Sequence, residues 1–294
     1  MPRLSHRSRK KKCDSGRTRQ TGREARTRPP MTSYAAKTPD AAGFIDYTAE
    51  EDAVWRDLVA RQLPMVQRHA AEPYLRGLEV LDMPRDRVPQ CPDLSRKLRA
   101  LTGWQVVPVP ALISFGRFFA MLAERSFPAA SFIRSRKDFD YIEEPDIFHE
   151  IFGHTPLLTD PRFAGFSQAI GRAGMACAKE DYAWLIRLYW FSIEFGLTVE
   201  GGETKTLGSG LASSPSELLW AVGQGAGQPE LRPFDVIDIL RTPYRIDIHQ
   251  PVYFVIERMD DLFAAAERDL LADVAKARKL GLHAPKYPPK QETA

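Results

Sequence analysis

Residues 182–197 restrict the fold more than any other part of the chain, because they form a strongly apolar run with few polar positions. Such a run is expected to form a buried helix. Glu194 lies inside it, and a carboxylate in this setting needs a partner. Arg187 precedes Glu194 by seven residues, which places both side chains on one face of an α-helix with Trp190 between them. Glu194 therefore either pairs with Arg187 in the core or binds a cation.

Most of the remaining chain also shows helical spacing of its apolar residues. Thr48 and Glu51 form a capping-box pattern before one helix, and Gly103 ends another. No internal repeat or linker divides the chain beyond residue 30. We therefore predict one domain over residues 31–294 that is mainly α with minor β structure. The expected helices cover residues 48–62, 65–81, 93–101, 114–124, 145–153, 161–177, 180–196, 215–222, 234–241 and 258–279, and the extended or strand-like pieces cover 105–110, 130–134, 197–207 and 244–255.

Charge separates the first 30 residues from the rest of the chain. They carry eleven Lys or Arg against two acids, so the formal net charge of +3 leaves the remaining residues at −6. A basic head with few apolar residues cannot bury enough surface to fold, so we expect residues 1–30 to be disordered. The composition also fits a nucleic-acid arm or an organelle transit peptide, and Met31 could be the true start. The acidic body argues against nucleic acid as the main partner.

The composition of the whole chain argues against a membrane protein and against a cysteine-rich protein. Hydrophobic residues make up 44% and charged residues 27%, which is typical of a globular protein. No run approaches the roughly 18 apolar residues of a membrane helix. Cys13, Cys91 and Cys177 are too few and too scattered for a disulfide framework or a thiolate metal site. We therefore expect a cytoplasmic protein without membrane contact.

Two of the six histidines lie in the otherwise apolar run 145–154. A helix-borne zinc protease motif places its histidines four residues apart on one face. His149 and His154 are five apart, about 140° around an ideal α-helix, so they can share a metal only if the helix tightens, bulges or ends between them. Gly153 is a natural place for that change. Two structural histidines at a helix end are the alternative.

With Glu194, these histidines make a two-histidine, one-carboxylate set. Non-haem iron(II) oxygenases use this triad, because it leaves coordination positions open for oxygen and substrate. Zinc accepts the same ligands and would support hydrolysis instead. The ligand types alone do not separate an iron oxygenase from a zinc metallohydrolase.

Two stretches resemble known motifs of the pterin-dependent aromatic amino acid hydroxylases. Residues 145–160 resemble the family's iron-binding signature, and residues 189–197 resemble its segment with the third ligand. The resemblance runs from about residue 103 to residue 262. It implies that His149, His154 and Glu194 bind a catalytic Fe(II), and that the co-substrates are O2 and tetrahydrobiopterin or a related tetrahydropterin.

The resemblance also implies roles for residues around the metal. Arg134, in a short strand entering the site, would grip the substrate carboxylate, since its fork of donors matches a planar anion. Because Arg134 is not a ligand, its truncation is expected to leave iron binding intact. The other residues implied to bind substrate are Trp190, which would line the aromatic pocket, and Gly210 and Ser213, in the loop that contacts the amino acid backbone. Two residues would face the pterin, namely Phe118, by stacking, and Glu150.

The resemblance favours phenylalanine as the substrate. Ile246 stands where the tyrosine-specific branch of the family has an acidic residue, so a tyrosine hydroxyl would lack that interaction. Asp247 is one position away, and a one-residue slip in the alignment would reverse the inference. Tryptophan is the alternative substrate.

The implied activity is hydroxylation of L-phenylalanine to L-tyrosine, the first step of phenylalanine catabolism. The chain resembles the short bacterial form of the family, which predicts a monomer. Five apolar residues in the helix at 258–279 could form an oligomer seam, but at barely three heptads they are expected to pack against the body; these are Leu262, Phe263, Leu270, Leu271 and Val274. A metallohydrolase and a nucleic-acid-binding protein are the competing classes.

Overall fold

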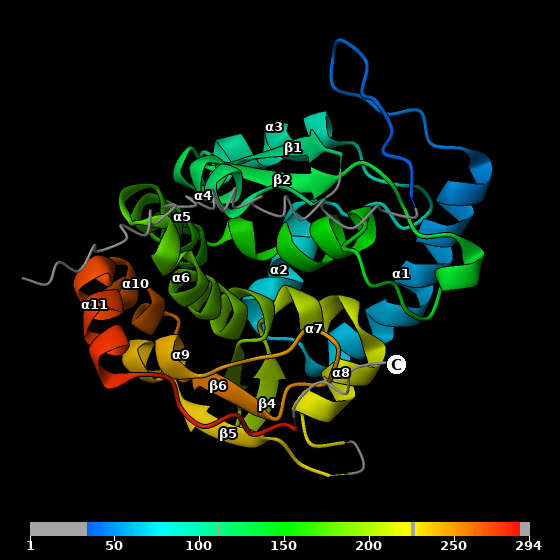
Figure 1. The fold of residues 1–294 in the computed structure, drawn as a ribbon. Coiled ribbons are helices and arrows are strands. Elements are labelled where there is room, and N and C mark those ends of the chain that lie inside the picture. The colour runs from blue at the N-terminus through cyan, green and yellow to red at the C-terminus, as the bar shows by residue number, and fades with distance from the viewer. Residues whose placement is uncertain (1–33, 111, 225–226, 289–294) are drawn as a thin grey trace, which may run out of the picture. The chain divides into compact units, whose positions relative to one another are not determined.

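Helices make up most of the fold, as the spacing of the apolar residues predicts (Figure 1). The computed structural model describes residues 34–110, 112–224 and 227–288, and the expectation for residues 1–30 lies outside them. The α-helices are α1 (Ala49–His69), α2 (Glu72–Val80), α3 (Cys91–Leu101), α4 (Phe115–Ala123), α5 (Pro161–Ala176), α6 (Tyr182–Tyr189), α7 (Ser209–Ser213), α8 (Pro215–Ala221), α9 (Val236–Arg241), α10 (Asp260–Ala266) and α11 (Leu270–Leu280). Two further segments, η2 (Phe148–His154) and η5 (Trp190–Glu194), are π-helical.

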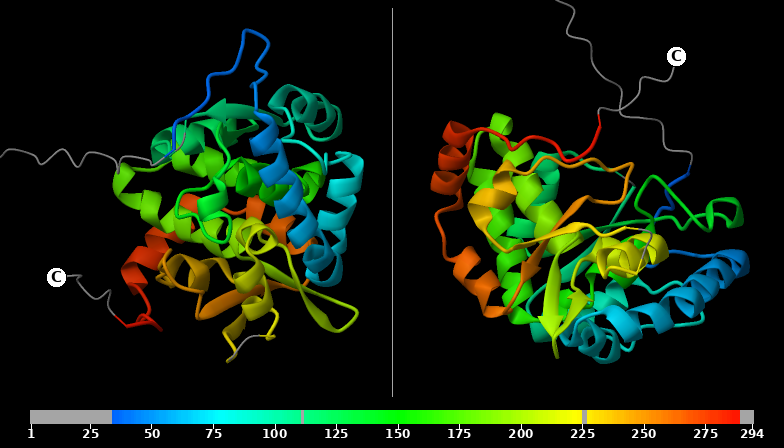
Figure 2. Two further views of the ribbon diagram at one scale, coloured as in Figure 1. Left: turned by 90° about the vertical axis from the view of Figure 1, so that its right-hand side faces the viewer. Right: turned by 90° about the horizontal axis from the view of Figure 1, so that it is seen from below.

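Two small sheets accompany the helices. Strands β1 (Gln105–Val109) and β2 (Ser126–Ala130) pair in parallel, and a mixed sheet has the order β4 (Glu203–Thr206), β3 (Leu197–Glu200), β6 (Val252–Ile256), β5 (Glu230–Pro233). Figures 1 and 2 show the two sheets at opposite ends of the helical layer. The strand expected at 130–134 is wrong in position, because β1 ends at Val109 and offers no partner beyond Ala130. Strand β5 was not expected from its charged sequence.

Helix boundaries differ from the predictions at several places. Gly210 and Ser213, expected in a loop, lie in α7. Helix α1 continues through Pro64 to His69, so the break expected near residue 63 lies at residues 70–71 instead. Proline removes one helical hydrogen bond, but Pro64 and Ala60 are exposed, so water can reach the freed carbonyl of Ala60. The helix expected at 258–279 divides into α10 and α11, because Asp269 caps a new helix by accepting from the amide of Ala272 at 3.0 Å.

Segment η2 is held by the aromatic core on the face away from its histidines. Phe148 lies edge-on to Trp55, with ring centroids 5.5 Å apart, and stacks on Phe152 at 5.0 Å. The hydroxyl of Tyr74 donates to the carbonyl of Phe152 at 2.7 Å. All four side chains are fully buried, so the backbone that carries the histidines is fixed by packing.

The apolar stripe near the C-terminal end packs against the body, as predicted. Leu262, Leu270 and Val274 are buried, whereas Phe263 and Leu271 remain partly exposed. Among the described residues, no helix has the length and apolar character needed to cross a membrane.

Candidate active site

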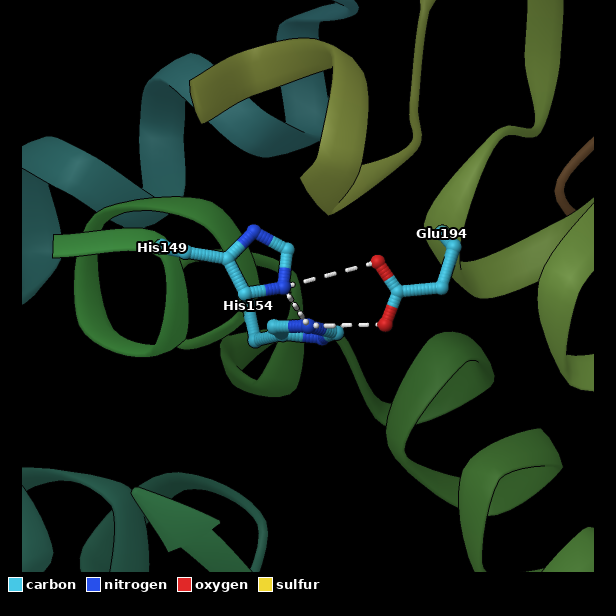
Figure 3. A group of neighbouring side chains, drawn as sticks. All are labelled: His149, His154 and Glu194. Carbon is cyan, nitrogen blue, oxygen red and sulfur yellow. Dashed lines mark hydrogen bonds and ion pairs between the residues drawn. The ribbon is translucent and has the colours of Figure 1, made fainter. Parts of the chain in front are cut away.

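The π-helical turn of η2 brings His149 and His154 together. In a π-helix, hydrogen bonds join residues five apart, so these two residues lie one above the other instead of on diverging faces. Figure 3 shows both rings on one side of η2, facing Glu194. The spacing that excluded a zinc protease motif is therefore compatible with a shared metal. Of the three changes considered between the two histidines, a tightening, a bulge or an end of the helix, the structure shows the bulge.

The three side chains form a compact cluster. The Nε2 atoms of His149 and His154 are 3.2 Å apart, and the carboxylate of Glu194 lies 3.1 Å from His154 Nε2 and 3.7 Å from His149 Nε2. One ligand atom from each residue lies within 4.8 Å of the others. This arrangement can hold one ion in contact with two imidazoles and one carboxylate.

The protonation states suit a cation. Burial lowers the pKa of His149 to about 4, although the nearby Glu194 opposes this shift. Burial alone would raise the pKa of Glu194, but His154, His149 and the hydroxyl of Ser209 lower it to about 2. At neutral pH the cluster therefore offers a neutral imidazole and an ionised carboxylate, which are the forms that bind divalent metal ions.

Helix α7 orients the first histidine. The hydroxyl of Ser213 donates its single proton to the carbonyl of Ser209 at 2.9 Å. With its proton there, the hydroxyl can accept from Nδ1 of His149, which lies 2.9 Å away. In this tautomer Nδ1 carries the ring proton, and the lone pair of Nε2 points into the cluster. On the second histidine, the hydroxyl of Tyr189 lies 3.4 Å from Nδ1 of His154.

Helix α7 also orients the carboxylate. The hydroxyl of Ser209 lies 2.8 Å from Oε2 of Glu194 and 3.2 Å from the carbonyl of Ile193, so it can donate to either oxygen. Helix α7 can approach η2 and Glu194 this closely because of two glycines: Gly153 faces the helix, and Gly208 directly precedes it. A Cβ on Gly153 would lie 2.8 Å from the carbonyl oxygen of Ser209, and a Cβ on Gly208 would collide with the carbonyl of Glu194.

Arg187 is not the partner of Glu194. The π-helical segment η5, closed by a bond from the amide of Phe195 to the carbonyl of Trp190 at 2.9 Å, turns Glu194 away from the face expected for a regular helix. Within the described residues Arg187 makes no ion pair, and its guanidinium lies 4.9 Å over the ring of Trp184. The core salt bridge considered from the sequence is therefore absent.

Arg134 follows β2 in a loop, beside the start of η2, and is bound to Asp146. Its Nε and Nη2 donate to the two carboxylate oxygens at 2.8 and 2.9 Å. Both side chains are buried, and Asp146 also accepts from the amide of His149 at 3.2 Å. The carboxylate of Asp146 thus links Arg134 to the first histidine. The expectation that Arg134 is independent of the metal side is therefore unsupported by the geometry.

Two residues assigned to the pterin lie on the side of His154. The ring of Phe118 meets that of Tyr189 edge-on at 5.0 Å, and Tyr189 in turn lies against His154. A carboxylate oxygen of Glu150 lies 3.9 Å from Nε2 of His154. Burial raises the pKa of Glu150 well above its usual range, and Glu194 and Asp146 raise it further. These effects favour the protonated form of the Glu150 carboxyl, which can donate a hydrogen bond.

Two of the other residues assigned to the substrate, Trp190 and Gly210, lie against the ring of Phe195. Trp190 stacks on Tyr244 with centroids 4.4 Å apart, and it contacts Phe195 at 4.5 Å. Gly210 is buried in α7, where a Cβ would lie 2.8 Å from the ring of Phe195. Ile246 is 68% exposed, so the structure does not bring it into the cluster. The substrate roles of Trp190, Gly210 and Ile246 stay predictions.

Comparisons with known proteins point to one enzyme family. The family model for biopterin-dependent aromatic amino acid hydroxylase matches residues 6–278. The phenylalanine-4-hydroxylase of Vibrio cholerae is 47% identical over 262 residues, which cover 89% of this chain and 90% of that protein.

Two solved structures share the fold. The apo cold-active phenylalanine hydroxylase of Colwellia psychrerythraea has a TM-score of 0.85 at 45% identity, covering 88% of this chain and all of that one. The phenylalanine hydroxylase of Chromobacterium violaceum with bound oxidised Fe(III) has a TM-score of 0.78 at 37% identity, covering 86% and 94% of the two chains.

Proposed function

The chain belongs to the biopterin-dependent aromatic amino acid hydroxylases, and we propose that it converts L-phenylalanine to L-tyrosine at the cluster of His149, His154 and Glu194. One observation carries the proposal. Two imidazole nitrogens and a carboxylate converge within 4.8 Å, and a serine hydroxyl of α7 supports one of the imidazoles and another supports the carboxylate. This is the ligand set of an iron site that keeps coordination positions open for reactants.

The donor set fits Fe(II) well. His149 would bind through Nε2, because its Nδ1 proton is engaged by Ser213. His154 would also bind through Nε2, and Glu194 through a carboxylate oxygen. Bound iron and tetrahydropterin would together activate O2, so that one oxygen atom enters the substrate ring and the other leaves with the oxidised pterin. The protein's part is to hold these groups in place and to keep the site dry.

Arg134 is the proposed partner of the substrate carboxylate. Asp146 occupies one fork of the guanidinium, formed by Nε and Nη2. A guanidinium has five N–H donors, so the fork formed by Nη1 and the second hydrogen of Nη2 can still bind an anion in two parallel bonds. Asp146 would then hold the guanidinium plane fixed while the substrate binds at its other edge. Lysine could not serve both carboxylates in this way.

The pterin would lie on the side of Phe118 and Glu150. Phe118 is partly buried and its edge rests on Tyr189, so its ring offers a face for stacking. Glu150 as a neutral acid could donate to a ring nitrogen or carbonyl of the pterin. Both groups border His154, so a cofactor held by them would lie next to the proposed iron.

The aromatic ring of the substrate would lie on the side of Trp190, with Gly210 and Ser213 near the amino acid backbone. Ile246, in the loop that follows Tyr244, would provide an apolar wall that favours phenylalanine over tyrosine. Ser213 already contacts His149, so a substrate bound beside Ser213 would be linked through this hydroxyl to the first metal ligand.

The test is a single anaerobic experiment. Protein, Fe(II), tetrahydropterin and phenylalanine are combined, O2 is added, and tyrosine is measured. We expect tyrosine only with all components present, and none when Zn(II) replaces Fe(II). Turnover of an ester or amide substrate without O2, with Zn(II) in place of iron, would instead support the metallohydrolase.

We further propose that residues 31–294 act as a monomer in the cytoplasm. The apolar residues of α10 and α11 that could form a seam are largely buried against the body, and Cys91 and Cys177 are free thiols. Light scattering should give the mass of one chain. A variant that begins at Met31 should keep its melting temperature and its activity, and a loss of several degrees would show that residues 1–30 stabilise the domain.

A further inference from the structure

Residues 243–251, here called the 243–251 loop, contact the proposed substrate side through one aromatic stack. Tyr244 lies 4.4 Å from Trp190 with the rings 20° from parallel. The indole N–H of Trp190 is buried and has no hydrogen-bond partner among the described residues. Ring packing against Tyr244 and Phe195 therefore sets the position of Trp190, which opens the π-helical segment ending at Glu194.

Residues 281–288, here called the 281–288 segment, bind the start of this loop. The hydroxyl of Tyr287 donates to the carbonyl of Tyr244 at 3.1 Å. Nη1 of Arg245 donates to the carbonyl of Pro288 at 3.0 Å, and its guanidinium lies 5.9 Å from the centre of the Tyr287 ring. Two consecutive loop residues are thus tied to a part of the chain more than forty positions away.

The 281–288 segment is itself anchored to regular structure. The amide of His283 donates to the carbonyl of Arg241 at 2.8 Å, and Nε of Arg241 donates to the carbonyl of Gly281 at 2.8 Å. Lys286 pairs with Glu230 of β5 at 3.0 Å. The two hydrogen bonds with Arg241 therefore fix the segment to α9 before it reaches the loop, whereas the exposed pair of Lys286 and Glu230 contributes little.

The far end of the loop is held separately, by α8. The amide of Gln250 donates to Glu217 at 2.9 Å, and the indole of Trp220 donates to the carbonyl of Gln250 at 2.9 Å. Between the two attachments Ile246 is exposed. The side chain of Gln250 also donates to the carbonyl of Arg245 at 2.7 Å, so loss of the attachment at Tyr287 would loosen the half of the loop that carries Tyr244 without detaching it.

We infer that the 281–288 segment positions the 243–251 loop, and that Tyr287 is a positioning residue for binding of the aromatic substrate through the stack of Tyr244 on Trp190. The inference rests on the proposed function for its effect on phenylalanine. The contact itself is independent of that function. Tyr287 touches neither the metal ligands nor the residues assigned to the pterin, so its effect should be confined to the substrate.

The first test compares Tyr287→Phe, which removes only the hydroxyl, with wild type. We expect the KM for phenylalanine to rise about fivefold, as for the loss of one hydrogen bond, while kcat and the KM for tetrahydropterin change less than about twofold. Lys286→Gln is the matched control, because it removes a contact of the same segment that goes to β5 instead of to the loop. It should leave all three constants unchanged.

A second measurement needs no activity. Trypsin should cleave after Arg245 several times faster in Tyr287→Phe than in wild type or Lys286→Gln, because the bound loop resists cleavage. In a Tyr244→Leu background, Tyr287→Phe should not raise the KM for phenylalanine further, since the stack through which it acts is gone.

The outcomes separate cleanly. An unchanged cleavage rate at Arg245 in Tyr287→Phe, or faster cleavage with an unchanged KM for phenylalanine, overturns the inference, as does an additive effect in the Tyr244→Leu background. If wild type forms no tyrosine at all, the proposed function fails. Loop release, read by trypsin alone, then still shows whether Tyr287 positions the loop.

Discussion

The cluster of His149, His154 and Glu194 and the 243–251 loop border the same proposed site but are stabilised in different ways. The cluster lies on two π-helical segments packed into the aromatic core, and its supporting bonds come from α7 and from Asp146. The loop has no regular structure of its own. It is held by hydrogen bonds from α8 and from the 281–288 segment.

This difference separates two demands on the site. Metal ligands must be held within a few tenths of an ångström, which requires locked rotamers and a buried scaffold. The 243–251 loop can be less rigid, because under the proposed function its residues would select the substrate and would not hold the ion. Substitutions in the cluster should therefore abolish function, whereas substitutions in the loop should change its selectivity.

The largest effect is expected for the ligands. His149→Ala, His154→Ala and Glu194→Ala should each lose stoichiometric iron and all detectable hydroxylation, because two remaining ligands bind iron weakly. The fold should survive, since the core face of η2 is unchanged. Iron is measured by elemental analysis and the fold by circular dichroism. The control is Glu203→Ala, an exposed glutamate that pairs with Lys205. Full iron occupancy in Glu194→Ala would remove that residue from the ligand set.

The next largest effect is expected for the buried pair of Arg134 and Asp146. Asp146→Ala leaves a buried guanidinium without its partner and removes a bond to the amide of His149, so the free energy of unfolding should fall by about 3–5 kcal/mol. Chemical denaturation measures it. Asp140→Ala is the control, because Asp140 pairs with Arg61 but is 94% exposed and should have no measurable effect.

Arg134→Ala should raise the KM for phenylalanine and also weaken iron binding. It would leave the buried carboxylate of Asp146, next to His149, without its charged partner. This replaces the simpler expectation that only substrate binding would suffer. Equal denaturation midpoints for wild type and Asp146→Ala would show that the pair contributes nothing to the scaffold of the cluster.

The sequence predicted the cluster side well because its determinants are local. His149 and His154 lie in one short run and Glu194 lies in a second, and the helix changes over Phe148–His154, the turn that includes Gly153. Helix α1 was also signalled locally by the capping box of Thr48 and Glu51, which the structure confirms. The continuation of α1 past Pro64 was not predicted. The free-energy cost of a proline inside a helix depends on whether water can reach the freed carbonyl, which the local sequence does not encode.

The supporting contacts could not be predicted, because they join residues far apart in the sequence. The bond between Ser213 and His149 spans 64 positions, and the bond from Tyr287 to the carbonyl of Tyr244 spans 43. Arg187 was considered for Glu194 because a regular helix would align them. The π-helical turn of η5 moves Glu194 off that face, and no sequence pattern marks such a turn on its own.

A smaller effect is expected for Ser213→Ala, which tests whether α7 tunes the cluster. Removing the hydroxyl takes away the partner of Nδ1 on His149, so iron affinity should fall about tenfold while the melting temperature changes little. Affinity is measured by competition with a chelator. Ser216→Ala is the control, because Ser216 lies on α8 and its hydroxyl contacts His249 of the 243–251 loop, which is not a ligand. Unchanged iron affinity in Ser213→Ala would show that packing alone orients His149.

The smallest and most selective effect is expected in the loop, for Ile246→Asp. A carboxylate at this position would accept a hydrogen bond from a tyrosine hydroxyl, worth less than the usual 1.5–3 kcal/mol for a charged acceptor because the side chain is 68% exposed. We expect the ratio of kcat/KM for tyrosine to that for phenylalanine to rise about tenfold, with little change in iron content or melting temperature. Ile246→Val is the control for the loop itself and should keep the wild-type ratio.

The exposure of Ile246 makes this experiment informative in either direction. Asp247 already stands one position away and is paired with Arg245 at 2.6 Å, so an acid is present in the loop but is engaged in a salt bridge. If a folded, iron-loaded Ile246→Asp protein keeps the wild-type ratio, then Ile246 does not face the substrate. The preference for phenylalanine must then come from residues around Trp190. The proposal that the cluster holds the metal while the 243–251 loop selects the substrate would then be wrong.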